Sequence, residues 1–190
     1  MTIYSIRVQG DPVLHRRAAE VRDFDEDLLR LVADMHETNA AANGVGLAAP
    51  QIGVSLRVFV YAMDNDDGVP PQGVLVNPSL VLGKISGNSP DPDDEAEGCL
   101  SVPGDHFPLK RAEWVRVNGF DAYGNKVEFE ATEWFARCMQ HEYDHLDGKL
   151  YVDKLVDRYK RKARRSAKDN GWGVPGLSWT PGIDPDPFGH

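Results

Sequence analysis

The sequence predicts an α+β fold, a domain of mixed but mainly antiparallel strands around a central helix. Two observations favour this class. Segments with the two-residue period of strands cluster in the middle of the chain, and they do not alternate with helices as the strands of a parallel α/β fold do. Segments with the period of an amphipathic helix come before and after this cluster. The 190 residues suit one domain with a well-buried core.

The first helix is predicted from Asp25 to Ala42. Leu28, Leu31 and Val32 recur at the three- and four-residue spacing of one helix face, and acidic residues stand at its start. The helix should therefore turn an apolar face to the core.

Five strands are predicted after this helix. In chain order they are Arg57 to Tyr61, Gly73 to Asn77, Leu80 to Ile85, Trp114 to Phe120 and Lys126 to Ala131. Turn residues between Asp121 and Asn125 join the last two as a hairpin. Two acidic stretches that contain proline, Asp64 to Gln72 and Ser86 to Ala96, are expected to be surface connections.

The central helix is predicted to stop at Gly148, which stands where a C-terminal cap belongs. His141 and His145 lie one turn apart near its end. Side chains four residues apart share a helix face, so both imidazoles can bind one cation. Glu142 flanks them, where it can accept a proton from bound water. This pattern predicts a metal-binding helix with its own base.

Two known peptidase patterns fail to supply a third ligand. Metzincins have a histidine at the position that Tyr151 occupies here, and no glutamate follows Glu142 to complete a thermolysin-type site. Asp153 and Asp157 remain alternatives, although such residues are usually solvated helix charges.

The two cysteines are the better candidates for this third ligand. Cys138 lies one turn before His141 but two turns from His145, so it is expected to pack in the interior or line a pocket. Cys99 follows Gly98 and precedes a Pro-Gly turn, in a loop that can approach a metal closely. A Cys-His-His set with an open fourth position is typical of catalytic sites, and it suits zinc.

A segment of small residues from Asn43 to Gly53 is predicted to border the same site. Its glycines let a substrate backbone come close, and the amide N–H of Gln51 suits an oxygen that gains negative charge. A phosphate-binding loop is the rival interpretation. The segment lacks the Lys-Ser/Thr of a Walker loop, and Ala49 breaks the glycine spacing of a dinucleotide site.

Three motifs in this order, GVGLAAPQ, EGCLS and QHEYDHLDG, resemble those of the peptide deformylase family. The resemblance runs from about Ile3 to Leu155. Members of this family remove the formyl group from the initiator methionine of new bacterial proteins. The resemblance thus implies a metal-dependent hydrolase that acts on formyl-methionyl nascent peptides and releases formate.

The resemblance also implies a role for each residue of the site. The implied roles are the metal ligands Cys99, His141 and His145, the general acid/base Glu142, the oxyanion donors Gln51 and Leu100 (through its backbone N–H), the substrate's backbone partner Gly46, and the methionine pocket Val45, Trp134 and Cys138. The implied metal in the cell is Fe²⁺. Ni²⁺ or Co²⁺ should substitute, and a purified sample could contain Zn²⁺.

Two other classes of function stay open at this point. A zincin-like metallopeptidase lacks the usual third ligands, and a non-catalytic metal-binding module leaves Glu142 and Gln51 without an evident role. The chain also departs from the family pattern. Many members carry an arginine after the Glu-Gly-Cys-Leu-Ser motif that helps to hold the peptide backbone, where this chain reads Asp105 to Leu109. The sequence leaves open whether Lys110 or Arg111 reaches the substrate in its place.

Charge and composition set the expected location and partners. The net charge of −9 argues against DNA binding, and the absence of a long apolar run argues against a signal peptide or a membrane partner. We expect a cytoplasmic monomer. The exception to the acidic character is a basic helix from Arg158 to Lys168, for which we hypothesise contact with ribosomal RNA.

The catalytic domain is predicted to span residues 1–168. Residues 169–190 are predicted to form a non-helical tail that is rich in glycine, proline and tryptophan.

Overall fold

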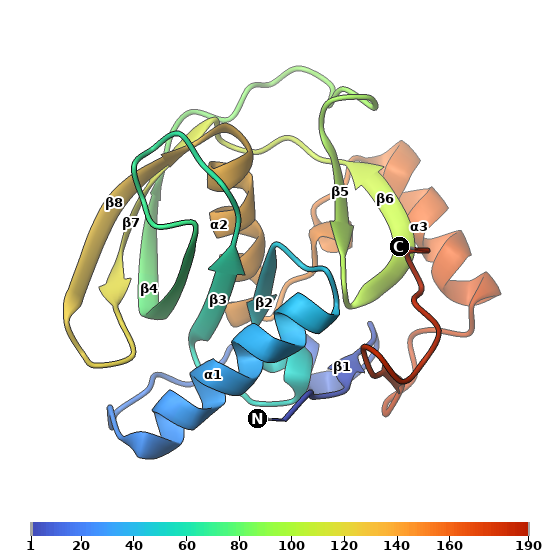
Figure 1. The fold of residues 1–190 in the computed structure, drawn as a ribbon. Helices are drawn as coiled ribbons and strands as arrows, with labels where there is room; N and C mark the ends of the chain where they lie inside the picture. The colour runs from blue at the N-terminus through green and yellow to red at the C-terminus, as the bar shows by residue number, and fades with distance from the viewer. Residues whose placement is uncertain (1, 190) are drawn as a thin grey trace.

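The computed structural model describes residues 2–189 and confirms the α+β class. Its main sheet has five antiparallel strands in the order β2-β3-β4-β7-β8 (Figure 1). These strands are β2 (Gly46–Ala48), β3 (Val58–Ala62), β4 (Gln72–Leu82), β7 (Trp114–Phe120) and β8 (Lys126–Thr132). The predicted hairpin of β7 and β8 is confirmed, with Trp114 opposite Thr132 at one end and Phe120 opposite Lys126 at the other.

The helices α1 (Glu26–Ala41) and α2 (Glu133–Leu146) cover opposite faces of this sheet. Successive side chains of a strand point to opposite faces. Val58 and Val60 of β3 pack in the core cluster that contains the buried face of α1, whereas Phe59 packs in the cluster that contains α2. The main sheet therefore packs against one side of the central helix α2.

Helix α1 begins at the acidic cap that the sequence predicts. The side chain of Asp25 accepts hydrogen bonds from the backbone N–H groups of Asp27 and Leu28, which satisfies two of the donors that an α-helix leaves open at its N-terminus.

The prediction of two separate strands at Gly73–Asn77 and Leu80–Ile85 was wrong. Residues 73–77 and 80–82 belong to one strand, β4, which ends at Leu82, three residues before the predicted end at Ile85. The register of β4 against β7 shifts between Val76 and Ser79. Asn77 lies at this irregularity with a φ of 49°, and its side-chain amide exchanges two hydrogen bonds with the backbone of Val21. The Asn-Pro pair interrupts the ladder locally, and the strand continues beyond it.

The prediction of a loop around Cys99 was also wrong. The residues form a hairpin of β5 (Ala96–Cys99) and β6 (Val102–Pro108), which is a separate two-stranded sheet. Glycine and proline lower the strand propensity of this segment, and backbone pairing decides its structure. Leu100 and Ser101 form its turn. The expected loop from Asn43 to Gly53 likewise contains β2 and the 3₁₀ helix η2 (Ala49–Ile52).

The C-terminal segment from α3 onward packs beside this hairpin and the N-terminal strand. Helix α3 (Asp157–Asp169) contacts β6, and the strand β9 (Ser178–Trp179) pairs antiparallel with β1 (Ile6–Arg7). Figure 1 shows the last residues, in dark red, running up in front of β6. Short 3₁₀ helices, η1 (Pro12–His15) and η3 (Tyr151–Asp153), complete the elements of the described chain. Within residues 2–189, no helix is long and apolar enough to cross a membrane.

Candidate metal centre and active site

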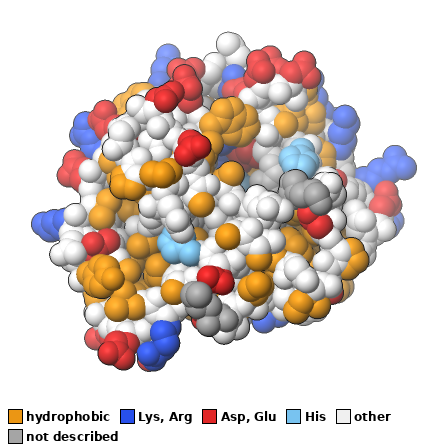
Figure 2. Space-filling view, in the orientation of Figure 1, with side chains coloured by type: hydrophobic (Ala, Val, Ile, Leu, Met, Phe, Trp, Pro, Cys, Tyr) orange, Lys and Arg blue, Asp and Glu red, His pale blue; other side chains and the backbone are white. Residues whose placement is uncertain are grey.

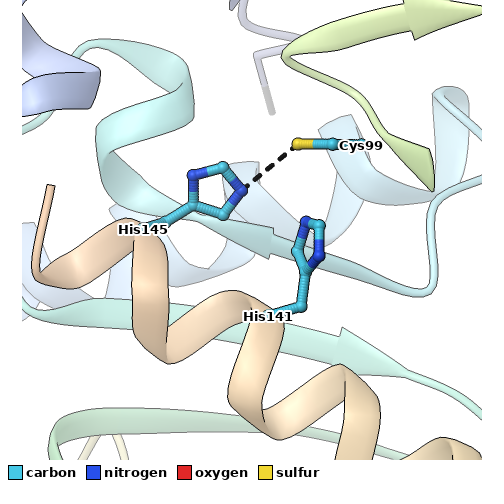
Figure 3. A group of neighbouring side chains, drawn as sticks. All are labelled: Cys99, His141 and His145. Atoms are coloured by element: carbon cyan, nitrogen blue, oxygen red, sulfur yellow. Dashed lines mark hydrogen bonds between the residues drawn. The ribbon is translucent and has the colours of Figure 1, made fainter. Parts of the chain in front are cut away.

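Cys99, His141 and His145 meet between α2 and the β5–β6 hairpin (Figure 3). Their candidate ligand atoms lie within 4.8 Å of one another. The Nε2 atom of His145 is 3.3 Å from the Sγ atom of Cys99. The structure thus brings together the three residues that the family resemblance implies as ligands, although Cys99 is far from the histidines along the chain.

The end of α2 holds the two histidines one turn apart. Their ring centroids are 5.1 Å from each other. Gly148 terminates the helix with a φ of 69°, and the N–H groups of Gly148 and Lys149 donate to the carbonyls of His145 and Asp144. This is the 6→1 and 5→2 bonding pattern of a Schellman cap. The cap satisfies the backbone carbonyl of His145, a candidate ligand, so the helix ends directly after the candidate site.

Cys99 is held by its own hairpin. The N–H of Ser101 donates to its sulfur at 3.4 Å, and the side-chain nitrogen of Gln51 lies 3.8 Å from the same atom. These contacts fix the position of the sulfur beside the two histidines.

Glu97 is a site residue that sequence reasoning missed. It lies two residues before Cys99 on β5, so both side chains point to the same face, toward α2. Its Oε2 atom is 3.0 Å from the Nδ1 atom of His141. A histidine that bonds a carboxylate through Nδ1 is left with Nε2 for a metal. The two-residue spacing to Cys99 was the available signal.

A buried network supports this carboxylate. Glu97 accepts two hydrogen bonds from Arg111 at 2.8 and 2.9 Å and one from Arg137 at 2.7 Å. Burial by itself raises the pKa of Glu97, but the bonds from Arg111 and His141 outweigh it and hold this pKa well below its ordinary value. The site therefore has a permanent negative charge behind His141.

Neither Lys110 nor Arg111 replaces the arginine of the family pattern. Arg111 also donates to Asp144 at 2.6 Å and is buried, whereas Lys110 pairs with Glu95 at 2.8 Å. Both cations form ion pairs with other residues of the protein, and neither lines the cleft described below.

Glu142 lies beside the histidines with its carboxylate buried. A Cβ atom placed on Gly46 would lie 2.5 Å from its Oε1 atom, so only a glycine in β2 leaves room for this carboxylate. Its Oε2 atom has no hydrogen-bond partner among the described residues. Burial raises the pKa of Glu142 to about 7. A carboxylate in this state is suited to accept and return a proton near neutral pH.

Gln51 is oriented by the backbone next to it. Its Oε1 atom accepts a hydrogen bond from the N–H of Ala48 at 2.8 Å. The amide nitrogen is therefore turned toward the metal-ligand cluster, where it lies near Cys99 and donates to the hydroxyl of Ser101 at 3.3 Å. A donor that is fixed in this way can hold an oxygen without reorganising.

The metal-ligand cluster opens into a cleft of about 240 Å³. Val45, Trp134 and Cys138 line it together with Leu100, and so does Met63, which sequence reasoning missed. In the space-filling view, hydrophobic side chains gather around a hollow on this face and the Lys and Arg side chains lie mostly at its edge (Figure 2). The cleft can therefore accept an apolar side chain beside the cluster.

The residues present fit a divalent metal. One sulfur and two imidazole nitrogens are a donor set that borderline-soft metals such as zinc and Fe²⁺ accept, and three protein ligands leave a position open for chemistry. Burial and the neighbouring His141 lower the pKa of His145 well below 6.5, so its imidazole is neutral and able to bind a cation. Cys138 is not part of this cluster of ligand atoms.

Comparisons with known proteins show the family of the chain. The family model of polypeptide deformylases matches residues 3–161. The chain is 55% identical to the peptide deformylase of Mycobacteroides abscessus over an alignment that covers all of both proteins. A crystal structure of a peptide deformylase from Legionella pneumophila matches with a TM-score of 0.75 and 41% identity, over 90% of this chain and 96% of that one. The crystal structure of the peptide deformylase from Thermus thermophilus gives 0.76 and 38%, over 88% and 94%.

Proposed function

The chain belongs to the polypeptide deformylase family, and we propose that Glu142 is the residue that moves the protons of its reaction. Enzymes of this family are metal-dependent hydrolases that remove the N-formyl group from nascent peptides, and this protein is one of them. The observation that carries the proposed role is the buried Oε2 atom of Glu142, which has no partner among the described residues and lies next to the cluster of candidate ligands.

Cys99, His141 and His145 would hold the metal. When bound there, the metal supplies a Lewis acid that makes water more acidic and polarises the formyl carbonyl. Glu97 fixes the ring of His141 through Nδ1, and the buried arginines fix Glu97. These contacts hold a ligand in one orientation before the substrate arrives.

Glu142 takes a proton from the attacking water, whose oxygen bonds to the formyl carbon. When the carbon–nitrogen bond breaks, Glu142 returns the proton to the leaving nitrogen. The products are formate and a free N-terminal amine. The raised pKa of about 7 supports both proton transfers, because the carboxyl group can then exist in either form near neutral pH.

Gln51 and Leu100 are the proposed donors to the oxygen that gains charge. The nitrogen of Gln51 is held toward the cluster by the bond from Ala48, and Leu100 follows the ligand Cys99 in the hairpin turn. Donors aimed at a developing negative charge stabilise the transition state more than the substrate, and one such donor is typically worth about 10²–10³ in kcat.

Gly46 is the proposed partner of the substrate's backbone. It lies in β2, an edge strand of the main sheet. The carbonyl of Val45 accepts from the N–H of Ala62, so the antiparallel alternation turns the N–H and C=O of Gly46 away from β3 and toward the open edge. An extended peptide can pair with such an edge.

The methionine side chain is proposed to enter the part of the cleft lined by Val45, Trp134, Cys138 and Met63. Cys138 is buried, whereas Val45 and Trp134 are 54% and 48% exposed, so the apolar floor leads to an open rim. Such a pocket matches an unbranched thioether side chain.

The experiment that tests this assignment is formate release from a formyl-Met tripeptide by anaerobically prepared protein loaded with Fe²⁺. Release should be fast in the wild type and be lost in Glu142→Gln. Glu133→Gln, an exposed glutamate on the first turn of the same helix, is the matched control and should keep its activity. A Glu142→Gln variant that keeps full activity would refute the role of Glu142. Cleavage of an unformylated peptide without formate would indicate a zincin-like peptidase instead, and metal binding with neither activity a non-catalytic module.

We propose Fe²⁺ as the metal in the cell, with Zn²⁺, Ni²⁺ or Co²⁺ as occupants of purified protein. A thiolate and two imidazoles accept all of these ions. The matched pair Cys99→Ser and Cys138→Ser tests the ligand set, because both thiols are buried and only one lies in the cluster. Cys99→Ser should lose the metal during dialysis and Cys138→Ser should keep it. Loss of activity in air by the Fe²⁺ form, with retention by the Ni²⁺ form, would support iron in the cell.

We also propose that α3 contacts ribosomal RNA. Its Tyr159 and Ala163 are buried against the protein, while Arg161, Arg164 and Arg165 are exposed. A helix with one anchored face and one basic face suits phosphate binding, and the substrate emerges from the ribosome. Reversing these three arginines to glutamate should abolish co-sedimentation with ribosomes. Reversing Arg22, Arg30 and Lys126, which are exposed and lie outside α3, should not. Unchanged binding of the first variant would refute the proposal.

A cytoplasmic monomer is the proposed working form. Formylated nascent chains are made in the cytoplasm, and every residue assigned to the site comes from one chain, so the reaction needs no second copy. Sedimentation equilibrium at micromolar concentration should give the mass of a monomer. A dimer would contradict this expectation.

A further inference from the structure

The C-terminal segment borders the catalytic cleft, although it lies outside the matched family model. Phe188 lines the same cleft as Leu100, His141 and Glu142. The family model ends at residue 161, so this wall of the cleft is contributed by a part of the chain that the family model does not describe.

Two anchors hold this segment in place. Strand β9 pairs with β1, with Trp179 opposite Ile6. The indole N–H of Trp179, which is buried, donates to the carbonyl of Leu100 at 2.9 Å. The C-terminal segment is therefore fastened directly to the hairpin turn that follows the ligand Cys99.

Phe188 is held by two rings. Its ring packs edge-on against His106 of β6, with centroids 6.1 Å apart, and lies 6.2 Å from the ring of Trp179. His106 also lines the cleft. Its ring lies directly against Gly98, where an added Cβ atom would be 2.6 Å from Nε2. Phe188 and His106 thus form one aromatic wall beside β5.

The position of this aromatic wall suits contact with the substrate residue that follows formyl-methionine. Successive side chains of an extended peptide point to opposite sides. If the methionine side chain lies among Val45, Trp134 and Cys138, the next side chain points away from them. Phe188 and His106 are aromatic side chains of the cleft lining to which no other role has been given.

We propose that Phe188, supported by His106, forms a subsite for an apolar side chain at the residue that follows formyl-methionine. This inference rests on the proposed function of the cleft. An aromatic ring offers contact area and no charge partner, so the subsite favours leucine or phenylalanine over serine or aspartate at this residue. The affinity gained from one apolar contact is commonly about tenfold.

The test compares formyl-Met-Leu-Ser with formyl-Met-Ser-Ser. The wild type should show the higher kcat/KM on the leucine peptide. Phe188→Ala should reduce the ratio of the two kcat/KM values by about five- to tenfold, through a raised KM for the leucine peptide and with kcat kept. Phe188→Leu should restore part of the ratio. Ile183→Ala, which removes an 81% exposed apolar side chain from the same segment, is the matched control and should leave the ratio unchanged.

Two outcomes would overturn the inference. One is an unchanged ratio in Phe188→Ala, and the other is an equal loss on both peptides, which would mean that Phe188 only supports the fold. These outcomes differ from a failure of the proposed function, in which the wild type would release no formate from either peptide.

Discussion

The Nδ1 atom of His141 lies 3.0 Å from the Oε2 atom of Glu97, and this carboxylate is itself bonded to Arg111 and Arg137. A helix residue that could bind a metal is thereby oriented by a strand residue two positions before Cys99. The buried charge has partners on all sides, so its removal should affect both the metal site and the fold.

We predict that Glu97→Gln weakens metal binding about 10- to 100-fold and destabilises the protein by about 3 kcal/mol. The neutral amide orients the imidazole less well. It also removes the carboxylate that Arg111 and Arg137 share, so that these buried guanidinium groups keep only Asp144 and Glu95 as charge partners. The measurements are chelator competition for the metal and denaturant unfolding. Glu95→Gln is the control, because Glu95 pairs with Lys110 and Arg137 but does not touch His141. It should keep its metal affinity, and equal losses in both variants would contradict the prediction.

Gly46→Ala should lower kcat strongly. The added methyl group would lie 2.5 Å from Oε1 and 2.7 Å from Cδ of Glu142, so the carboxylate must move out of its position. A displaced proton acceptor commonly costs about 10²-fold in rate. Steady-state kinetics of formate release measure this effect. Gly87→Ala, where an added Cβ atom has no neighbour within 4 Å, should behave as the wild type. An unimpaired Gly46→Ala enzyme would show that the position of Glu142 is not critical.

Gln51→Glu should reduce kcat by about 10²–10³ and leave KM nearly unchanged. The substitution keeps the shape of the side chain but replaces a donor beside the Cys99 sulfur with an oxygen. Gln140→Glu is the comparison. That buried amide bonds the backbone of Ala112 at 3.0 and 2.9 Å, away from the ligands, so its loss should lower the free energy of unfolding rather than kcat. A raised KM with normal kcat in Gln51→Glu would point to substrate binding instead of transition-state stabilisation.

Gly148→Ala should destabilise the protein by about 3 kcal/mol, measured by denaturant unfolding. The residue has a φ of 69°, and its added Cβ atom would lie 2.6 Å from the backbone nitrogen of Arg16. Gly171 has nearly the same φ, 70°, but open space around it. Gly171→Ala should therefore cost only the backbone strain, about 1 to 2 kcal/mol. Equal costs would mean that the contact with Arg16 relaxes freely.

The local patterns of the sequence account for the α-helices and for the part of the candidate site that lies on α2. His141, Glu142 and His145 share a helix, and helical periodicity alone places their side chains side by side. The cap at Gly148 and the β7–β8 hairpin follow from equally short-range signals. The β5–β6 hairpin was not predicted. Its glycines and prolines lower the strand propensity of the segment, and the strands form because their backbones pair with each other.

The sequence by itself determined the type of chemistry. The spacing of His141 and His145 on one helix indicates a metal site, and three motifs resemble those of a family of metal-dependent hydrolases. Only the tertiary structure decided how distant segments meet at the site. The contact of Glu97 with His141, the fit of Gly46 against Glu142 and the approach of Phe188 to the cleft join elements that no local period connects. The physical reason is that such contacts depend on how sheets, helices and the C-terminal segment pack as whole bodies, whereas propensity and spacing act within a few residues.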